Sequence, residues 1–273
     1  MGMKICVVTG SRADAGLLAW PTKILSEDGH FEVDVLSIRD GIPAHYALAE
    51  TRFIAKRPDC VLLLGDRFEI LAAATAAHLQ RVPIAHIAGG DVSEGSYDDA
   101  MRDCVSRMAA IHFATSPSSA ARLVGMGCRN VYDVGSTGID YIMHGDWKRE
   151  RPIEEPYVVV SYQAETIDDT VNLQAVTEAV AGRKAVWIRP NPDRGSERIP
   201  QGESFSHPEF LNLLYHCDCF IGNSSAILYE APFLKPGGIP CHMIGKRQRG
   251  RVIPWGNGRA SERIRDVLRL TVL

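Results

Sequence analysis

The feature that most constrains this chain is a repeating order of short apolar runs and helical patterns. Apolar runs at residues 3–9, 60–65 and 82–88 each lead into a glycine turn or a polar turn, and a helical pattern follows. Uninterrupted apolar runs of this length are typical of parallel strands that are buried on both faces. The same order begins again at residues 157–162, after a charged stretch with two prolines at residues 144–156. The pattern therefore predicts an α/β fold with two Rossmann-like parallel sheets and a cleft between the two halves.

The charged stretch divides the chain into two predicted domains. Residues 1–148 form the N-terminal domain and residues 149–273 form the C-terminal domain. A last helical pattern at residues 261–270 belongs to the second domain or packs back on the first. The length of 273 residues agrees with one large or two small domains.

Charge and cysteine content argue against several classes of protein. The net charge is −3, so the chain as a whole has no basic field that would attract nucleic acid. Seven cysteines are scattered without the spacing of metal ligands, which is typical of reduced thiols in a cytoplasmic protein. No apolar run approaches the length that spans a membrane, and no signal-peptide pattern opens the chain. We therefore predict a cytoplasmic protein without a membrane partner.

Residues 217–230 combine a short apolar strand, a glycine turn and a helix start. Gly222 permits the tight turn, and the residues after it, Asn223, Ser224 and Ser225, are of the types that cap helices. A helix start after a strand exposes backbone N–H groups, which suit a phosphate. Glu230, placed farther along the same predicted helix, can accept hydrogen bonds from a ribose. The alternative is an ordinary strand–turn–helix cap with a solvated glutamate.

The first predicted strand runs into a loop at residues 10–16, and an apolar helix is expected at residues 17–25. Arg12 in this loop can clamp a diphosphate or a sugar. The alternative is a surface arginine that pairs with Asp14. The loop does not match the G-x-G-x-x-G fingerprint, so no nicotinamide or flavin cofactor is indicated.

Carboxylates and arginines recur where predicted strands end or predicted helices begin. In open α/β sheets, ligands bind at the carboxyl ends of the strands, so a shared site is expected for these side chains. The residues concerned are Asp66, Arg67, Asp91, Asp98, Asp99 and Arg102. Asp66 and Arg67 have an alternative role as a helix cap with a salt bridge. The acids at residues 98 and 99 can also simply complement a helix dipole, and Arg102 can pair with either of them.

A basic run occupies residues 246–251 and includes Arg247, Arg249 and Arg251. It can hold an anionic substrate or a nucleic-acid backbone. The alternative is a solvated loop.

Taken together, these motifs resemble the UDP-N-acetylglucosamine 2-epimerase family, most closely its hydrolysing branch in sialic-acid synthesis. The matching stretches occur in the family's order over nearly the whole chain: residues 8–13, 64–69, 86–87, 89–91, 97–99 with 102, 191 with 195–196, 221–225 with 230, and 247–248 with 250–251. The resemblance implies a GT-B fold, a UDP-sugar bound between two Rossmann-like domains, no metal and no cofactor. It also implies a homo-oligomer, because family members are often dimers.

The resemblance implies roles for individual residues. Asp66 and Asp91 would flank the sugar as acid and base, and Asp98 and Arg102 would support them. The residues expected to bind the substrate are Arg12, Arg67, Gln163, Asn191, Ser196, Ser224, Ser225, Glu230 and Arg247. The reaction would eliminate UDP with the help of a base at C2 of the sugar. The resulting glycal would then be hydrated to N-acetylmannosamine, and two carboxylates in different environments suit these two steps.

Three positions depart from the family pattern. Ala88 stands where an acid or a histidine is common, and Asp91 stands where a longer glutamate is usual. Gln163 replaces a histidine, and a glutamine donates hydrogen bonds but cannot carry a proton in catalysis. The chain is also shorter than the family norm. These departures leave the nucleotide site better supported than the epimerase chemistry.

Three hypotheses for the function remain. The first is a hydrolysing 2-epimerase. The second is a compact GT-B glycosyltransferase that passes the sugar to a large acceptor, even DNA, and the departures favour it. The third is a nucleotide-sugar-binding protein without catalysis, which the retained Asp66, Asp91, Asp98 and Arg102 argue against. The first is preferred.

Overall fold

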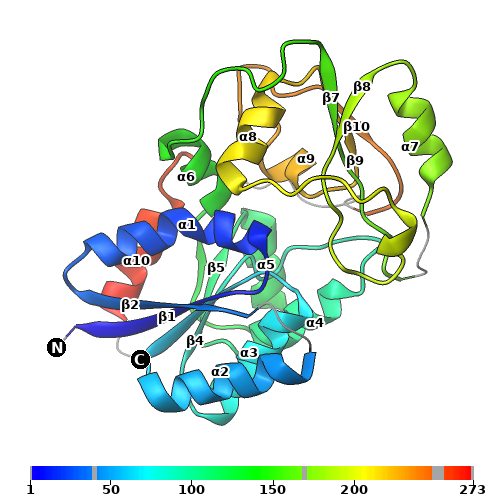
Figure 1. The fold of residues 1–273 in the computed structure, drawn as a ribbon. Coiled ribbons are helices and arrows are strands. Elements are labelled where there is room, and N and C mark those ends of the chain that lie inside the picture. The colour runs from blue at the N-terminus through cyan, green and yellow to red at the C-terminus, as the bar shows by residue number, and fades with distance from the viewer. Residues whose placement is uncertain (1, 39–41, 168–170, 248–254, 272–273) are drawn as a thin grey trace. The chain divides into compact units, whose positions relative to one another are not determined.

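The computed structural model describes residues 2–38, 42–167, 171–247 and 255–271 (Figure 1). Its residues group into two compact units. Unit 1 consists of Met1–Asp91, Asp98–His144 and Pro254–Leu273. Unit 2 consists of Val92–Tyr97 and Gly145–Ile253.

Unit 1 is built on a six-stranded sheet with the order β2-β1-β3-β4-β5-β6. Each pair of neighbouring strands is parallel. The strands are β1 (Met3–Thr9), β2 (Phe31–Ser37), β3 (Cys60–Leu64), β4 (Ile84–Ile87), β5 (Ile111–Ala114) and β6 (Val131–Asp133). The described helices are α1 (Arg12–Glu27), α2 (Ile42–Lys56), α3 (Phe68–Leu79), α4 (Asp98–Met108), α5 (Pro117–Gly125), α6 (Thr137–His144) and α10 (Ala260–Leu270).

Both faces of this sheet are covered, because successive residues of each strand point to opposite sides. In β1, Ile5 and Val7 belong to a core cluster with residues of α1 and α10. Cys6 and Val8 belong to a second cluster with residues of α2, α3 and α4. Figure 1 shows α1 and α10 on one face of the sheet and α2 and α3 on the other. Helix α10, the last element of the chain, is therefore part of the first core.

The strand order of unit 1 reverses between β1 and β3, because β2 lies on one side of β1 and β3 lies on the other. In open parallel sheets such a reversal leaves a crevice at the carboxyl ends of the two strands, where ligands bind. The loops that begin at Gly10 and Gly65 meet this position, so their polar residues are placed at the usual binding edge.

Unit 2 is built on a four-stranded parallel sheet with the order β10-β9-β7-β8. Its strands are β7 (Tyr157–Ser161), β8 (Lys184–Trp187), β9 (Cys219–Gly222) and β10 (Cys241–Met243). Its described helices are α7 (Leu173–Val180), the 3-10 helix η1 (Ser196–Arg198), α8 (His207–His216) and α9 (Ala226–Tyr229). The order reverses between β7 and β9, so the loops after Ser161 and Gly222 occupy the equivalent edge.

Two sequence-based expectations about these loops are wrong. Helix α1 begins at Arg12 rather than after residue 16, because the Ser11 hydroxyl caps it by accepting a hydrogen bond from the Asp14 amide at 3.2 Å. Helix α9 is a single turn, and Glu230 is its C-cap rather than a residue farther along it. Pro232 follows two residues after that cap, where a helix cannot continue. Within the described residues, no helix is long and apolar enough to cross a membrane.

Candidate active site

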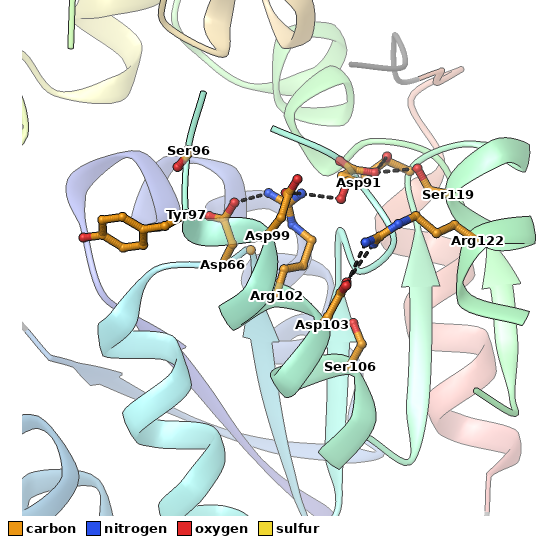
Figure 2. A network of polar contacts seen from close by, with 12 residues as sticks. Asp66, Asp91, Ser96, Tyr97, Asp99, Arg102, Asp103, Ser106, Ser119 and Arg122 are labelled. Carbon is orange, nitrogen blue, oxygen red and sulfur yellow. Dashed lines mark hydrogen bonds and ion pairs between the residues drawn. The ribbon is translucent and has the colours of Figure 1, made fainter. Parts of the chain in front are cut away.

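Four residues of unit 1 form an acid–arginine cluster: Asp66, Asp91, Asp99 and Arg102 (Figure 2). Arg102 comes from α4, and its side chain is only 1% exposed. It forms an ion pair with Asp66, at the carboxyl end of β3, and a second ion pair with Asp99 at 2.9 Å. It also donates a hydrogen bond to the backbone carbonyl of Asp91. A buried guanidinium thus fixes two carboxylates and one loop at a single point.

The Asp91 side chain is buried and oriented by hydroxyl groups. Its Oδ1 atom accepts hydrogen bonds from Thr115 Oγ1 at 2.7 Å and from Ser119 Oγ at 2.6 Å. The preceding Gly90 has a φ of +78°, and a Cβ there would overlap the Ser119 carbonyl, so the turn requires glycine. Asp66 is partly open to solvent and paired with a cation, whereas Asp91 lies among hydroxyls. The two acids therefore stand in different environments, and their roles as acid and base stay predictions.

Arg67 and Asp98 border this cluster. The Arg67 guanidinium pairs with Glu69 through two contacts of 3.1 and 3.2 Å, as in the salt-bridge alternative. Asp98 is the first residue of α4 and is half-buried, where it complements the helix dipole. The substrate and support roles expected of these two residues stay predictions.

Asp14 is a titratable residue of this edge that the sequence did not single out. It is 7% exposed, and its Oδ2 atom has no hydrogen-bond partner among the described residues. The Gly10 turn and Glu69 lie beside it, and the charges of Asp66 and Arg67 act on it. Burial raises the pKa of Asp14 to about 6. The tight Gly10 turn before a hydroxyl cap was the only signal in the sequence, and it did not reveal the burial.

The raised pKa of Asp14 predicts a pH-dependent stability. The folded chain keeps this proton up to about pH 6, whereas an unfolded chain loses it near pH 3.8. The contribution of this proton to the free energy of unfolding is fully present below pH 3.8. It is lost as the pH rises to 6, which lowers the free energy of unfolding by up to about 3 kcal/mol. We expect Asp14→Asn, which cannot ionise, to become progressively more stable than the wild type over this pH range. Urea unfolding of both proteins at pH 4 to 7 measures this, and a pH-independent difference would contradict it.

His86, in one of the matching sequence stretches, has a structural role. Its ring is fully buried on β4, with Nε2 2.8 Å from the Gly65 carbonyl and Nδ1 3.0 Å from Ser106 Oγ. Burial lowers the pKa of His86 to about 4, so the ring is neutral at neutral pH. The neutral ring donates from Nε2 to Gly65 and accepts from the serine. It therefore holds the turn that carries Asp66.

In unit 2, one buried asparagine joins the two loops at the strand-order reversal. Asn223 Oδ1 accepts a hydrogen bond from the backbone N–H of Gln163 at 2.7 Å, and Asn223 Nδ2 donates one to the backbone carbonyl of Gln163 at 2.8 Å. The side-chain oxygen of Gln163 in turn accepts a hydrogen bond from the backbone N–H of Asn191 at 2.8 Å. Gln163, which stands where the family commonly has a histidine, thus connects three loops through neutral hydrogen bonds.

The remaining expected ligand-binding residues of unit 2 surround these loops. Ser224 and Ser225 are half-buried at the start of α9, and Ser196 begins η1. Glu230 is buried, with His207 Nε2 at 3.7 Å from its Oε1 atom, a neighbour 23 positions away that no local pattern indicates. Arg247 is also buried and donates to the Ala164 carbonyl at 2.9 Å.

Parts of the predicted site lie outside the described residues. They are the side chain of Arg12 and the basic residues Arg249 and Arg251. Among the residues that the structure describes, no group of three or more histidine, cysteine or acidic side chains is arranged to hold a metal ion.

Comparison with protein families shows which family the chain belongs to. The family model of UDP-N-acetylglucosamine 2-epimerase matches residues 45–253. The chain belongs to this family. That stretch contains both the acid–arginine cluster and the loops of the unit 2 sheet, so the epimerase family pattern extends over both units.

Similar proteins include hydrolysing epimerases of this family. The chain is 29% identical to the UDP-N,N'-diacetylbacillosamine 2-epimerase (hydrolyzing) of Legionella pneumophila, over 84% of this chain and 78% of that protein. It is also 29% identical to a UDP-N-acetylglucosamine 2-epimerase of Neisseria meningitidis, over 71% of this chain and 57% of that protein. A GDP/UDP-N,N'-diacetylbacillosamine 2-epimerase (hydrolyzing) of Campylobacter jejuni is 24% identical over 80% of this chain, which spans 64% of its length.

Solved structures establish the GT-B-like fold of this epimerase family member. The Methanocaldococcus jannaschii UDP-GlcNAc 2-epimerase, solved in complex with UDP-GlcNAc and UDP, superposes with a TM-score of 0.79. The match covers 97% of this chain and 99% of that chain at 17% identity. The Neisseria meningitidis enzyme bound to UDP-GlcNAc gives a TM-score of 0.74 with the same coverage and identity. The expected α/β fold with two parallel sheets is confirmed.

Proposed function

We propose that this protein is a hydrolysing UDP-N-acetylglucosamine 2-epimerase, which releases N-acetylmannosamine and UDP. The observation that carries the proposal is the acid–arginine cluster, found at the ligand-binding edge of a chain that belongs to this family. Nucleotide-sugar binding alone does not need several carboxylates, whereas proton transfer at a sugar carbon needs a positioned acid and base, which carboxyl groups can supply.

The proposed reaction has two steps, both of which need proton transfer. In the first, a carboxylate removes the C2 proton as the C1–O bond breaks, which gives a glycal and UDP. In the second, water adds its oxygen to C1, and C2 receives a proton on the opposite face. Asp66 and Asp91 are the proposed acid and base, because Asp66 pairs with the Arg102 guanidinium and Asp91 accepts hydrogen bonds from two hydroxyls at the same edge of the sheet. Arg102 would orient Asp66, and Asp98 would support the helix start beside it.

The nucleotide would be held by the unit 2 loops. Backbone N–H groups and the hydroxyls of Ser224 and Ser225 would contact the phosphates, and Glu230 would accept from the ribose. Helix α9 has only four residues, so individual hydrogen bonds rather than a long helix dipole would bind the anion. Arg12 would contact the diphosphate.

A second substrate is supported by a specific observation. Two relatives that match 80% or more of this chain are named as hydrolysing diacetylbacillosamine epimerases. The same elimination and hydration would apply to that sugar, so the proposed reaction type does not depend on which of the two substrates is used.

The decisive experiment is incubation with UDP-N-acetylglucosamine or UDP-N,N'-diacetylbacillosamine in D₂O, with and without sugar acceptors. We expect the 2-epimeric free sugar, with deuterium at C2, to form without an acceptor. The sugar that reacts identifies the substrate. Free sugar that keeps its configuration and its C2 hydrogen would contradict the proposal. A glycosylated acceptor would instead establish a glycosyltransferase.

A further inference from the structure

The chain passes between the two units twice within eight residues, at the acid–arginine cluster. Asp91 belongs to unit 1, the six residues Val92–Tyr97 belong to unit 2, and Asp98 belongs to unit 1 again. We call Val92–Tyr97 the strap. Both of its ends are covalently attached to residues of the proposed reaction site, as Figure 2 shows for Ser96 and Tyr97 ahead of α4.

Within unit 2, the Thr166 hydroxyl forms hydrogen bonds with the strap. Ser96 Oγ lies 3.2 Å from Thr166 Oγ1, and the Tyr97 amide donates to the same oxygen at 3.3 Å. Ser96 and Thr166 are both buried. Gly95 has a φ of +78°, and a Cβ there would lie 3.0 Å from the Arg247 amide nitrogen, so the strap also packs closely on this backbone.

Thr166 belongs to the same loop as Gln163, one of the residues expected to bind the substrate. This loop follows β7, and its Gln163 is fixed by Asn223. Two further contacts join it to the segment after β10: Glu165 accepts from the Lys246 amide, and Arg247 donates to the Ala164 carbonyl at 2.9 Å. The strap, the loop after β7 and the segment after β10 therefore form one hydrogen-bonded body.

The other side of the strap is equally constrained. The Asp91 carbonyl, one bond before the strap, accepts from Arg102. Tyr97 directly precedes Asp98 and Asp99, and Asp99 pairs with the same arginine at 2.9 Å. A displacement of the strap therefore moves the backbone attachment of Arg102 and the first turn of α4.

We infer that Thr166 is a positioning residue for the acid–arginine cluster, so that nucleotide bound at the unit 2 loops orders the acids through the strap. The inference rests on the proposed function and adds a residue to it. Thr166 acts without touching the sugar: its hydroxyl sets the strap, and the strap sets Arg102 and Asp99.

Thr166→Val tests the inference, because it removes the hydroxyl but keeps the shape of the side chain. Loss of two hydrogen bonds is expected to lower kcat about tenfold while KM changes less than twofold. Thr166→Ser keeps the hydroxyl and is expected to restore kcat. Ser96→Ala, which leaves the Tyr97 contact intact, is expected to have a smaller effect than Thr166→Val.

Hydrogen exchange with UDP as the probe tests the same link without turnover. UDP is expected to slow amide exchange at residues 223–230 in both the wild type and Thr166→Val. At residues 98–102 it is expected to slow exchange only in the wild type. Protection of residues 98–102 in both proteins, or in neither, overturns the inference while UDP binding leaves the proposed function standing. The expected pattern without any sugar turnover supports the link and contradicts the proposed reaction. If UDP does not bind, both are overturned.

Discussion

Replacing Asp66 with Asn is expected to lower kcat by about a thousandfold, while the Kd for UDP changes less than twofold. The asparagine amide keeps the shape of the side chain but can neither take up nor release a proton at C2 of the sugar. Arg102 keeps its ion pair with Asp99 at 2.9 Å and its bond to the Asp91 carbonyl, so the buried guanidinium is not left without an anion. Steady-state rates, a UDP titration by calorimetry and a melting curve measure the three effects separately.

Asp103→Asn is the matched control for this variant. Asp103 is also paired with an arginine of unit 1, since both of its oxygens lie 2.7 Å from the Arg122 guanidinium. That pair is about one-third exposed and lies outside the acid–arginine cluster. The kcat of Asp103→Asn is expected to stay within twofold of the wild-type value. If Asp66→Asn lost turnover, UDP affinity and folding together, Asp66 would be a structural residue.

The sequence predicts the strands and the grouping of the acids for the same physical reason. A strand covered on both faces must be apolar along its whole length, and the polar residues after it then mark its carboxyl end. Asp66 and Asp91 follow such strands, so parallel pairing alone brings them to one edge. The helical spacing lets Arg102 pair with either of the acids at 98 and 99, and in the structure it pairs with Asp99.

What the sequence could not predict depends on contacts between distant residues. Asp14 looks like a loop residue in the sequence, and it is buried beside the Gly10 turn and Glu69, which lies 55 positions away. The contact between Ser96 and Thr166 joins positions 70 residues apart, and no periodic pattern encodes such a pair. Local signals were also misleading at α9, where the helix-capping residues introduce a single turn before Pro232.

Gly222→Ala is expected to destabilise the fold by about 4 kcal/mol, the largest effect on stability that we predict. Gly222 ends β9 with a φ of +138°, which side chains rarely adopt. A Cβ at this position would also overlap the carbonyl of Ser161 on the neighbouring strand β7. A rotamer change cannot relieve a clash between a Cβ and a backbone carbonyl. Strands β7 and β9 would therefore have to separate at the loops that carry Gln163 and Asn223.

Two other glycines separate the causes of this effect. Gly29 has open space where a Cβ would lie and no positive φ, so Gly29→Ala is expected to be neutral or to stabilise by about 0.5 kcal/mol. Gly182 has a φ of +72° but equally open space, so Gly182→Ala is expected to cost about 1 kcal/mol. Urea unfolding of the three variants measures the series. Equal losses for Gly182→Ala and Gly222→Ala would show that the backbone angle alone matters, and that β7 and β9 do not approach as closely as the structure describes.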